Sequence, residues 1–362
     1  MFDWAHCYVC GGIADVEFGT FTKSLHTLKR PTTYKELGRY LAPWAFPKAF
    51  GKLDHLFSEP AIKTNLAKGS FSCTASEFLT MTPVLARYVS KVCVPRGHDM
   101  AMVESMLAVL RVVEILQAVR RGVIDAESLR TAIVGHVRLY IEAYGDDAVR
   151  PKHHYVMHLP DALLRFGTLI GTLTNERKHR MVKRFAGNRA NLARWELGAV
   201  EDLSCQEAHA ISKPFTSSSQ TTSKAHPKAL AVLRELHPDR AEGDFALHAQ
   251  VQVANGTAKS GDAVLLEHES GLAVGELIMS FSVQGPGASE TSSALALWRE
   301  MQSADDPRMA QYRLEESTVV VRTSALLCAC AHRLLTTERP LVCICLMSTA
   351  LKTMRAWWSA RA

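Results

Sequence analysis

The chain has 362 residues, of which 47% are hydrophobic and 22% are charged. This composition excludes a mainly disordered, collagenous or fibrous chain, and the length is enough for about two domains of ~100–200 residues. The net charge of +6 is unevenly distributed. Residues 150–194 contain ten Lys and Arg against two acidic residues, whereas residues 243–327 contain five against eleven. Such asymmetry indicates contact of the basic segment with a polyanion.

The chain contains nine cysteines, and its first residues lack the basic start and apolar core of a secretory leader. We therefore expect reduced thiols in an intracellular protein without a signal peptide. The longest late apolar run, residues 341–347, is far shorter than the ~20 residues needed to cross a bilayer. A membrane partner is not expected.

Three long helices are predicted in the first 200 residues. Thr74 and Glu77 have the spacing of a capping box, at the start of an apolar-periodic stretch that ends near residue 92. From 99 to 121, apolar residues including several methionines recur every three or four positions. A third helix is expected between a capping Asp125 and Gly145. We expect the methionines of these helices to fill the core.

The second half of the chain differs from the first in composition and in the spacing of its apolar residues. Residues 212–227 are rich in Ser, Thr, Lys and Pro, which predicts a linker, and a short helix is expected at 228–236. Alternating apolar residues separated by Gly-containing turns then predict strands. These strands are expected at 245–253, 263–267, 272–283, 294–301 and 318–321.

The predicted fold class is therefore α+β. We expect a mainly helical body over 1–211, a linker and short helix over 212–242, a small β-barrel over 243–330, and a tail over 331–362 that fits neither domain. Several short strands with glycine turns favour a barrel that resembles the SH3-like or chromatin-associated kind. An architecture of this kind does not identify what it binds.

Two segments combine unusual residue types at fixed spacing. Residues 151–185 contain Lys152, His154 and His158, and later the run Glu176-Arg-Lys-His179-Arg. Residues 2–7 read Phe-Asp-Trp-Ala-His-Cys. Together they resemble the catalytic region of transposases of CACTA-like DNA transposons, in which a D-x-M-H segment, a K-x-H…H-x-P segment and an E-R-K-H-R helix follow in that order. Ala5 stands where that family usually has Met.

The resemblance implies an RNase H-like catalytic region in which three carboxylates bind two Mg²⁺ or Mn²⁺ ions. Asp3 and Glu176 match two of these carboxylates, with His6 and His179 as companion residues. Carboxylate oxygens suit Mg²⁺, and two ions would hold the attacking and leaving oxygens of a phosphodiester. Only two residues precede Asp3, and nothing around Asp15 matches the missing carboxylate. We therefore expect an incomplete RNase H-like remnant that binds metal weakly and does not catalyse.

The same acidic residues also permit structural roles. Asp3 could cap a helix, and Glu176 could pair with Arg180 one helical turn later. The histidines of the second segment permit either a metal cluster or buried, hydrogen-bonded positions, and we favour burial. These histidines are His153, His154, His158 and His179.

The paired cysteines also permit two interpretations. The spacing of Cys7 and Cys10 is that of half a zinc knuckle or of a redox pair, although two ordinary buried thiols are favoured. Cys328 with Cys330, and Cys343 with Cys345, alternate within apolar runs. We expect core packing for both of these pairs.

A cluster of cations forms the predicted nucleic-acid contact. Because the resemblance is to DNA-handling proteins and few acids accompany the cluster, we favour phosphate contact over a solvated face, with weak sequence specificity for DNA. Three hypotheses result: an inactive transposase-derived protein in the nucleus, an active two-metal nuclease whose missing carboxylate comes from elsewhere, and an interaction module whose acidic barrel binds a basic peptide. The first is favoured. The predicted contact residues are Arg177, Lys178, Arg180, Lys183 and Arg184.

Overall fold

The computed structural model describes most of the helical half and the β-strands. Glu176, His179 and the five predicted contact cations lie outside the described residues, as does most of the predicted linker. The described residues are 3–9, 11–27, 34–48, 53–119, 125–169, 171, 198, 201, 204–205, 208, 227–236, 238, 245–253, 256–268, 271–283, 291–303, 309–336 and 339–343.

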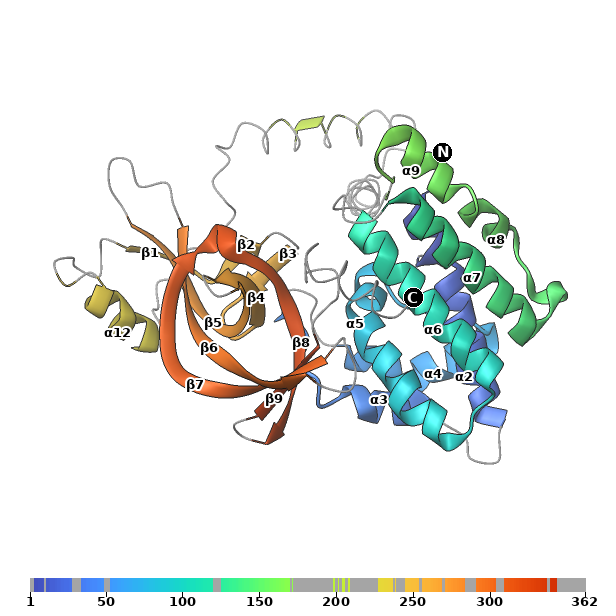
Figure 1. Cartoon of the computed structure of the whole chain (residues 1–362), viewed down its shortest axis with the longest axis horizontal. Coiled ribbons are helices and arrows are strands. Elements are labelled where there is room, and N and C mark those ends of the chain that lie inside the picture. The colour runs from blue at the N-terminus through green and yellow to red at the C-terminus, as the bar shows by residue number, and fades with distance from the viewer. Residues whose placement is uncertain are drawn as a thin grey trace.

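The N-terminal half is helical, and in Figure 1 its helices lie on one side of the molecule with a curled sheet on the other. α6 runs through the middle of this helical body and contacts α2, α5 and α7. The helices are α1 (Trp4–Tyr8), α2 (Ile13–Thr27), α3 (Tyr34–Leu41), α4 (Glu59–Lys68), α5 (Ala75–Tyr88), α6 (Met100–Val119), α7 (Ala126–Tyr144), α8 (Pro151–Val156), α9 (Leu159–Phe166) and α12 (Pro227–Leu236).

The three long helices predicted from the sequence are confirmed. Thr74 caps α5, because its backbone N–H donates to Glu77 Oε2 at 2.7 Å and its hydroxyl accepts from the Glu77 amide at 3.4 Å. α5 ends earlier than predicted, at Tyr88, and a π-helical turn (Val89–Cys93) follows it. Asp125 caps α7 by accepting from the Ser128 amide at 2.7 Å. α7 ends at Tyr144 and is followed by Gly145, whose φ of 82° favours glycine.

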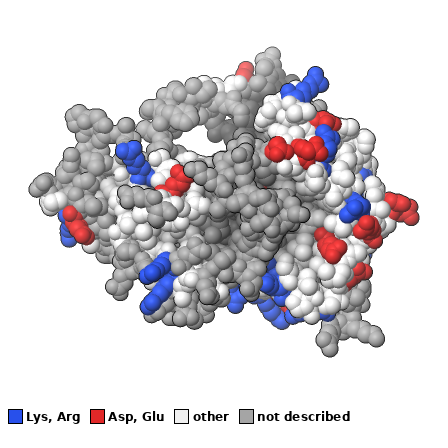
Figure 2. Space-filling model, viewed as in Figure 1, with Lys and Arg blue, Asp and Glu red and all other residues white. Residues whose placement is uncertain are grey.

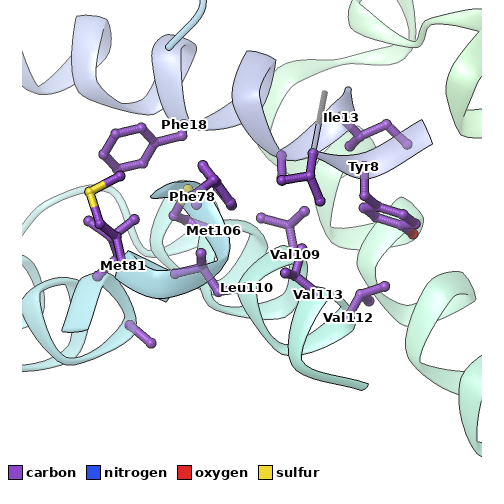
Figure 3. Close-up of a cluster of buried hydrophobic side chains, with 14 of the residues drawn as sticks. Tyr8, Ile13, Phe18, Phe78, Met81, Met106, Val109, Leu110, Val112 and Val113 are labelled. Atoms are coloured by element: carbon purple, nitrogen blue, oxygen red, sulfur yellow. The ribbon is translucent and has the colours of Figure 1, made fainter. Parts of the chain in front are cut away.

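The core of the helical body is apolar and continuous across α1, α2, α5 and α6. Figure 3 shows Phe18, Phe78, Met81 and Met106 converging between these helices. Met81 and Met106 are fully buried, so the prediction that methionines fill the core is confirmed for both, whereas it is wrong for Met100 of α6, which is 48% exposed. The length of α6 allows one helix to bury side chains against several neighbours.

The strands form one curled antiparallel sheet in the order β1-β5-β4-β8-β9-β7-β6 and a separate β2–β3 hairpin. Because β5 also pairs with β6, the ladder returns on itself. The α+β class is therefore confirmed. The strands are β1 (Phe245–His248), β2 (Gln250–Val253), β3 (Gly256–Lys259), β4 (Ala263–His268), β5 (Gly271–Val283), β6 (Thr291–Ser303), β7 (Met309–Arg322), β8 (Leu326–Thr336) and β9 (Arg339–Cys343).

The strand boundaries differ from the sequence-based ones in two places. The predicted strand 245–253 is two strands, since β1 pairs with β5 whereas β2 pairs with β3. Alternation identifies the buried face of a strand but not its partner. The sheet also continues past the expected boundary at residue 330, because β8 runs to Thr336 and β9 pairs with both β8 and β7. Pro340 within β9 weakens the strand signal there.

The helical body and the sheet are joined by the segment that follows α3. Ala45 forms an antiparallel bridge with His332 of β8, with N···O distances of 2.7 and 3.0 Å. The Lys48 amide donates to Asp262 Oδ1 at 3.0 Å, and the Lys48 ammonium donates to the Ser260 carbonyl at 2.6 Å. Asp262 is 3% exposed, so a buried carboxylate accepts the partly buried hydrogen bond that links the two parts of the chain.

Met106→Ala should lower the free energy of unfolding by about 2–5 kcal/mol, because it leaves a cavity in a packed core. The matched control is Met100→Ala on the same helix, where the side chain is 48% exposed and the expected change is within about 0.5 kcal/mol. Urea unfolding measured by circular dichroism gives both values. Equal effects of the two substitutions would contradict the burial of Met106 within α6.

Candidate functional site at the junction of α1 and α8

Asp3 acts as the N-cap of α1. One carboxylate oxygen accepts from the Ala5 amide at 2.9 Å, and the other lies 2.5 Å from His6 Nδ1. The Asp3 side chain is only 16% exposed, whereas that of His6 is 46% exposed. Both carboxylate oxygens of Asp3 therefore already have partners, the Ala5 amide at the start of α1 and the imidazole of His6. This is the helix-capping role that the sequence also permitted.

Lys152 of α8 forms hydrogen bonds at the other end of α1. Its ammonium donates to the carbonyls of His6 at 2.7 Å and Gly11 at 2.8 Å. The last carbonyls of a helix lack partners within the helix, and a cation there is favoured by the helix dipole. This contact brings together the two segments that carry the family resemblance, although 146 residues separate Lys152 from His6.

The chain after α9 returns to the same place. Leu169 is buried in the helical core, and a Cβ on Gly171 would lie 2.6 Å from Nε1 of Trp4. No side chain fits at that distance, so a glycine is required where the backbone crosses α1. The start and the end of the described helical half therefore meet at α1.

Asp15 of α2 is buried directly under this junction. It is 2% exposed, and one oxygen accepts from the Gly11 amide at 2.7 Å. Burial raises the pKa of Asp15 to about 8, although the amides of Gly11 and Gly12 and the charge of Lys152 act in the opposite direction. Asp15 therefore carries its proton at neutral pH, which is unsuitable for an Mg²⁺ ligand.

Glu17 forms a second buried polar group below α8. Its two oxygens contact His136 Nε2 of α7 at 2.8 Å and the hydroxyl of Ser105 of α6 at 2.6 Å. Glu17, His136 and Ser105 are each completely buried. Sequence reasoning missed this group; the available signal was a charged residue between the apolar Val16 and Phe18.

His153 extends the buried group towards α8. It is 2% exposed, and its Nδ1 accepts from the Arg150 amide at 3.0 Å. Its ring packs on Tyr140 with a centroid distance of 4.4 Å. Burial and the nearby His136 lower the pKa of His153 to about 4. The expectation of a buried, hydrogen-bonded histidine is confirmed for His153.

The same expectation is wrong for the other two histidines of this segment that the structure describes. His154 and His158 are both exposed. Their Nε2 atoms lie 3.3 Å apart, with ring centroids separated by 4.9 Å and ring planes at 85°. The rings therefore meet on the outer surface, where α8 leads into α9.

Three of the cysteines that the sequence analysis singled out are buried thiols in the structure. Cys7 is buried, and burial raises its pKa to about 11. Cys328 and Cys330 lie in the core of the sheet with their Sγ atoms 3.7 Å apart. A thiol with a raised pKa is protonated at neutral pH and is a poor nucleophile or metal ligand. Packing is therefore confirmed for these three cysteines.

A cavity of about 800 Å³ lies beside α3 and the segment that joins the helical body to the sheet. Sequence reasoning missed it, because its wall combines α3, the segment after it and the turn before α4. Three cations and one acid line this cavity. The lining residues are Lys35, Gly38, Arg39, Leu41, Ala42, Trp44, Ala45, Phe46, Lys48, Leu53, Asp54 and Phe57.

Among the described residues, no three His, Cys, Asp or Glu side chains are grouped so that they could hold a metal ion. Within the described part of the chain, none of the helices combines the length and apolar character that crossing a bilayer requires.

The chain matches no known protein family, no curated protein and no solved structure at a significant level.

Asp15→Asn should flatten the pH dependence of stability. Between the ordinary pKa near 4 and the folded pKa of about 8, the folded chain keeps a proton that the unfolded chain has lost. The contribution of Asp15 to stability is therefore complete at low pH and is lost as pH rises, by up to about 1.4 kcal/mol per pH unit. Chemical denaturation from about pH 5 to about pH 8 measures the slope.

The control for this prediction is Asp147→Asn, at an exposed acid near the end of α7. Its curve should run parallel to that of the wild type. Asp15→Asn should instead gain stability relative to the wild type as pH rises. Parallel curves for all three proteins would show that the carboxylate of Asp15 is ionised in the folded chain.

Proposed function

We propose that this chain is a transposase-derived protein that contacts nucleic acid and does not cleave it. The observation that carries the proposal is the contact between Lys152 and the carbonyls of His6 and Gly11. If two short segments resembled CACTA-like transposases only by chance, nothing would require them to lie in contact in the fold. Here they lie against each other, which supports a common origin for both.

The absence of cleavage is proposed because the acids around α1 are committed to other partners. Asp3 caps the helix, Asp15 is buried with a raised pKa, and Glu17 is held by His136 and Ser105. Two-metal cleavage needs ionised carboxylates that are free to bind the ions. Recruiting Asp3 would cost the cap, worth about 0.5–2 kcal/mol. Weak binding of Mg²⁺ or Mn²⁺ by Asp3 and Glu176 is the most that this proposal allows.

Nucleic-acid contact is assigned to the basic segment that follows the junction. Glu176 comes five residues after Gly171, and the cations from Arg177 to Arg184 come directly after it. On the face seen in Figure 2, the described helical half displays acidic as well as basic side chains. A mixed surface of this kind attracts a polyanion weakly, whereas the basic segment has few acids. A nuclear location belongs to the same proposal.

Removing four of these cations should flatten the salt dependence of DNA binding. The variant carries Ala at Lys178, Arg180, Lys183 and Arg184. The slope of log K against log salt should become shallower by about 0.9 for each phosphate contact that is lost. Fluorescence anisotropy with a duplex of arbitrary sequence measures this slope at several salt concentrations.

The control removes the same charge elsewhere, by Ala at four exposed cations of the helical body. A specific contact surface predicts a much smaller change of slope in this control than in the test variant. Equal slopes for the wild type and the test variant, or no DNA binding at low salt, would contradict the proposal. The control cations are Lys63, Lys68, Lys91 and Arg138.

The purified chain should not nick supercoiled DNA in Mg²⁺ or Mn²⁺, because too few carboxylates are free to position two ions. Gel electrophoresis after extended incubation checks this expectation. The control variant is Glu176→Gln, which should behave like the wild type. Nicking by the wild type that Glu176→Gln abolishes would support an active metal-dependent nuclease instead.

For the sheet, we retain the sequence-based proposal of a barrel of the SH3-like kind. The pairing of β5 with both β4 and β6 supports closure. Its acidic character suggested a basic peptide as partner, but Asp262 is already used by the amides of Lys48 and Lys259. Asp262 is therefore not available to such a peptide, and we propose nucleic-acid contact rather than peptide binding as the function of the chain.

A further inference from the structure

The cavity of about 800 Å³ beside α3 has the volume of a small-molecule site. Ligand pockets usually measure about 300–1,000 Å³ and combine mostly apolar walls with a few polar groups. Here several of the lining side chains are aromatic, and others are cations. The aromatic lining residues are Trp44, Phe46 and Phe57, and the cations are Lys35, Arg39 and Lys48. Volume and lining therefore both fit an organic ligand with an apolar body.

The walls of this cavity are held in place by contacts with the rest of the fold. Phe57 packs on Phe71 with ring centroids 5.9 Å apart. A Cβ on Gly38 would lie only 2.9 Å from the Cβ of Phe57, so α3 approaches this wall closely. On the segment after α3, Ala45 is bridged to His332 of β8. A site with walls that are already fixed loses little entropy when a ligand enters.

Arg39 of α3 is the cation best placed to bind an anion in this cavity. Its side chain is exposed and lies one helical turn after Lys35, on the same face of α3. The ion pairs that the structure describes around α3 join Lys35 to Glu59 at 2.8 Å and Arg96 to Glu36 at 2.5 Å, and neither uses Arg39. Its planar guanidinium matches the oxygens of an anionic group in a bidentate contact.

Lys48 adds a second positive charge from the segment after α3. Its ammonium donates to the Ser260 carbonyl at 2.6 Å, and an ammonium has three N–H donors, so this contact leaves donors for an anion. The one acid among the lining residues is Asp54. Arg39 and Lys48 together outweigh this single negative charge. The charge of the lining therefore favours an anionic ligand over a neutral or cationic one.

We propose that this cavity binds a small organic anion with a planar aromatic body, such as an aromatic carboxylate or sulfonate. The body packs against the aromatic walls, since aromatic rings attract each other in stacked and edge-to-face arrangements. The anionic group binds the guanidinium of Arg39. The site uses none of the cations between Arg177 and Arg184, so the proposal does not depend on nucleic-acid contact.

The test compares two fluorescent probes that differ by one charged group, each titrated into the full chain. Anilinonaphthalene sulfonate carries the anion, and phenylnaphthylamine has the same rings without it. Arg39→Gln should weaken the binding of the sulfonate by about tenfold, as expected for the loss of one hydrogen bond between charged groups. The same substitution should leave the affinity for phenylnaphthylamine unchanged, because the uncharged probe has no partner for the guanidinium.

A second variant fills the cavity without removing core atoms. Ala42 lines the cavity and is exposed, so the indole of Ala42→Trp should take up the space of the ligand and abolish the saturable binding of both probes. The matched control is Arg138→Gln, at a side chain of α7 that is 76% exposed, and it should bind both probes as the wild type does. Because all three positions are exposed, circular dichroism should show the same helix content in every variant.

Two results of these titrations would overturn the proposal. One is the absence of saturable sulfonate binding by the wild type, or equal affinities in the wild type, Arg39→Gln and Ala42→Trp. The other is a loss of both probes in Arg39→Gln, which would show that the guanidinium does not act on the anionic group.

A second measurement locates the bound probe. A naphthalene sulfonate that carries an aryl azide is activated by light on the full chain, and mass spectrometry of the digested protein identifies the modified peptides. The adducts should lie on peptides from residues 35–57 and should decrease when anilinonaphthalene sulfonate is present in excess. Adducts confined to other parts of the chain would overturn the proposal.

Discussion

The complete burial of Glu17 is the constraint on which the helical half depends. An unpaired carboxylate in a protein interior costs several kcal/mol, and removing one partner of a buried pair typically costs 3–5 kcal/mol. Glu17 therefore requires both His136 and Ser105, which fixes α2 against α6 and α7 at one point. A fully satisfied, hydrogen-bonded carboxylate in the interior specifies one arrangement of the elements that hold it.

The consequences of this constraint reach the surface through α8. His136 lies under His153, whose ring packs on Tyr140, so the position of α7 sets the position of α8. α8 then places Lys152 at the carbonyls that end α1. The side chains of α1 and α8, whose sequence pattern most resembles a catalytic centre, are thus the last members of this series of structural contacts. Their spacing in the sequence reflects this packing as well as any ancestral chemistry.

The parts of the fold that could be predicted are those set by local interactions. Capping residues such as Thr74 and Asp125 determine where a helix begins, because the groups that they satisfy lie within three residues. The burial of Glu17 could not be predicted, since its partners lie 88 and 119 residues away. The split of 245–253 into β1 and β2 was missed for the same reason, because strand partners are set by distant segments. Asp3 was ambiguous in the sequence because caps and metal ligands use the same residue type.

The run Lys152-His153-His154 shows why spacing alone did not separate these roles. Consecutive residues of an α-helix point about 100° apart. Three neighbouring side chains of α8 therefore serve three directions: Lys152 reaches α1, His153 enters the core, and His154 meets His158 on the surface. A segment that resembles one functional unit in the sequence divides into two structural contacts and one exposed pair of imidazoles.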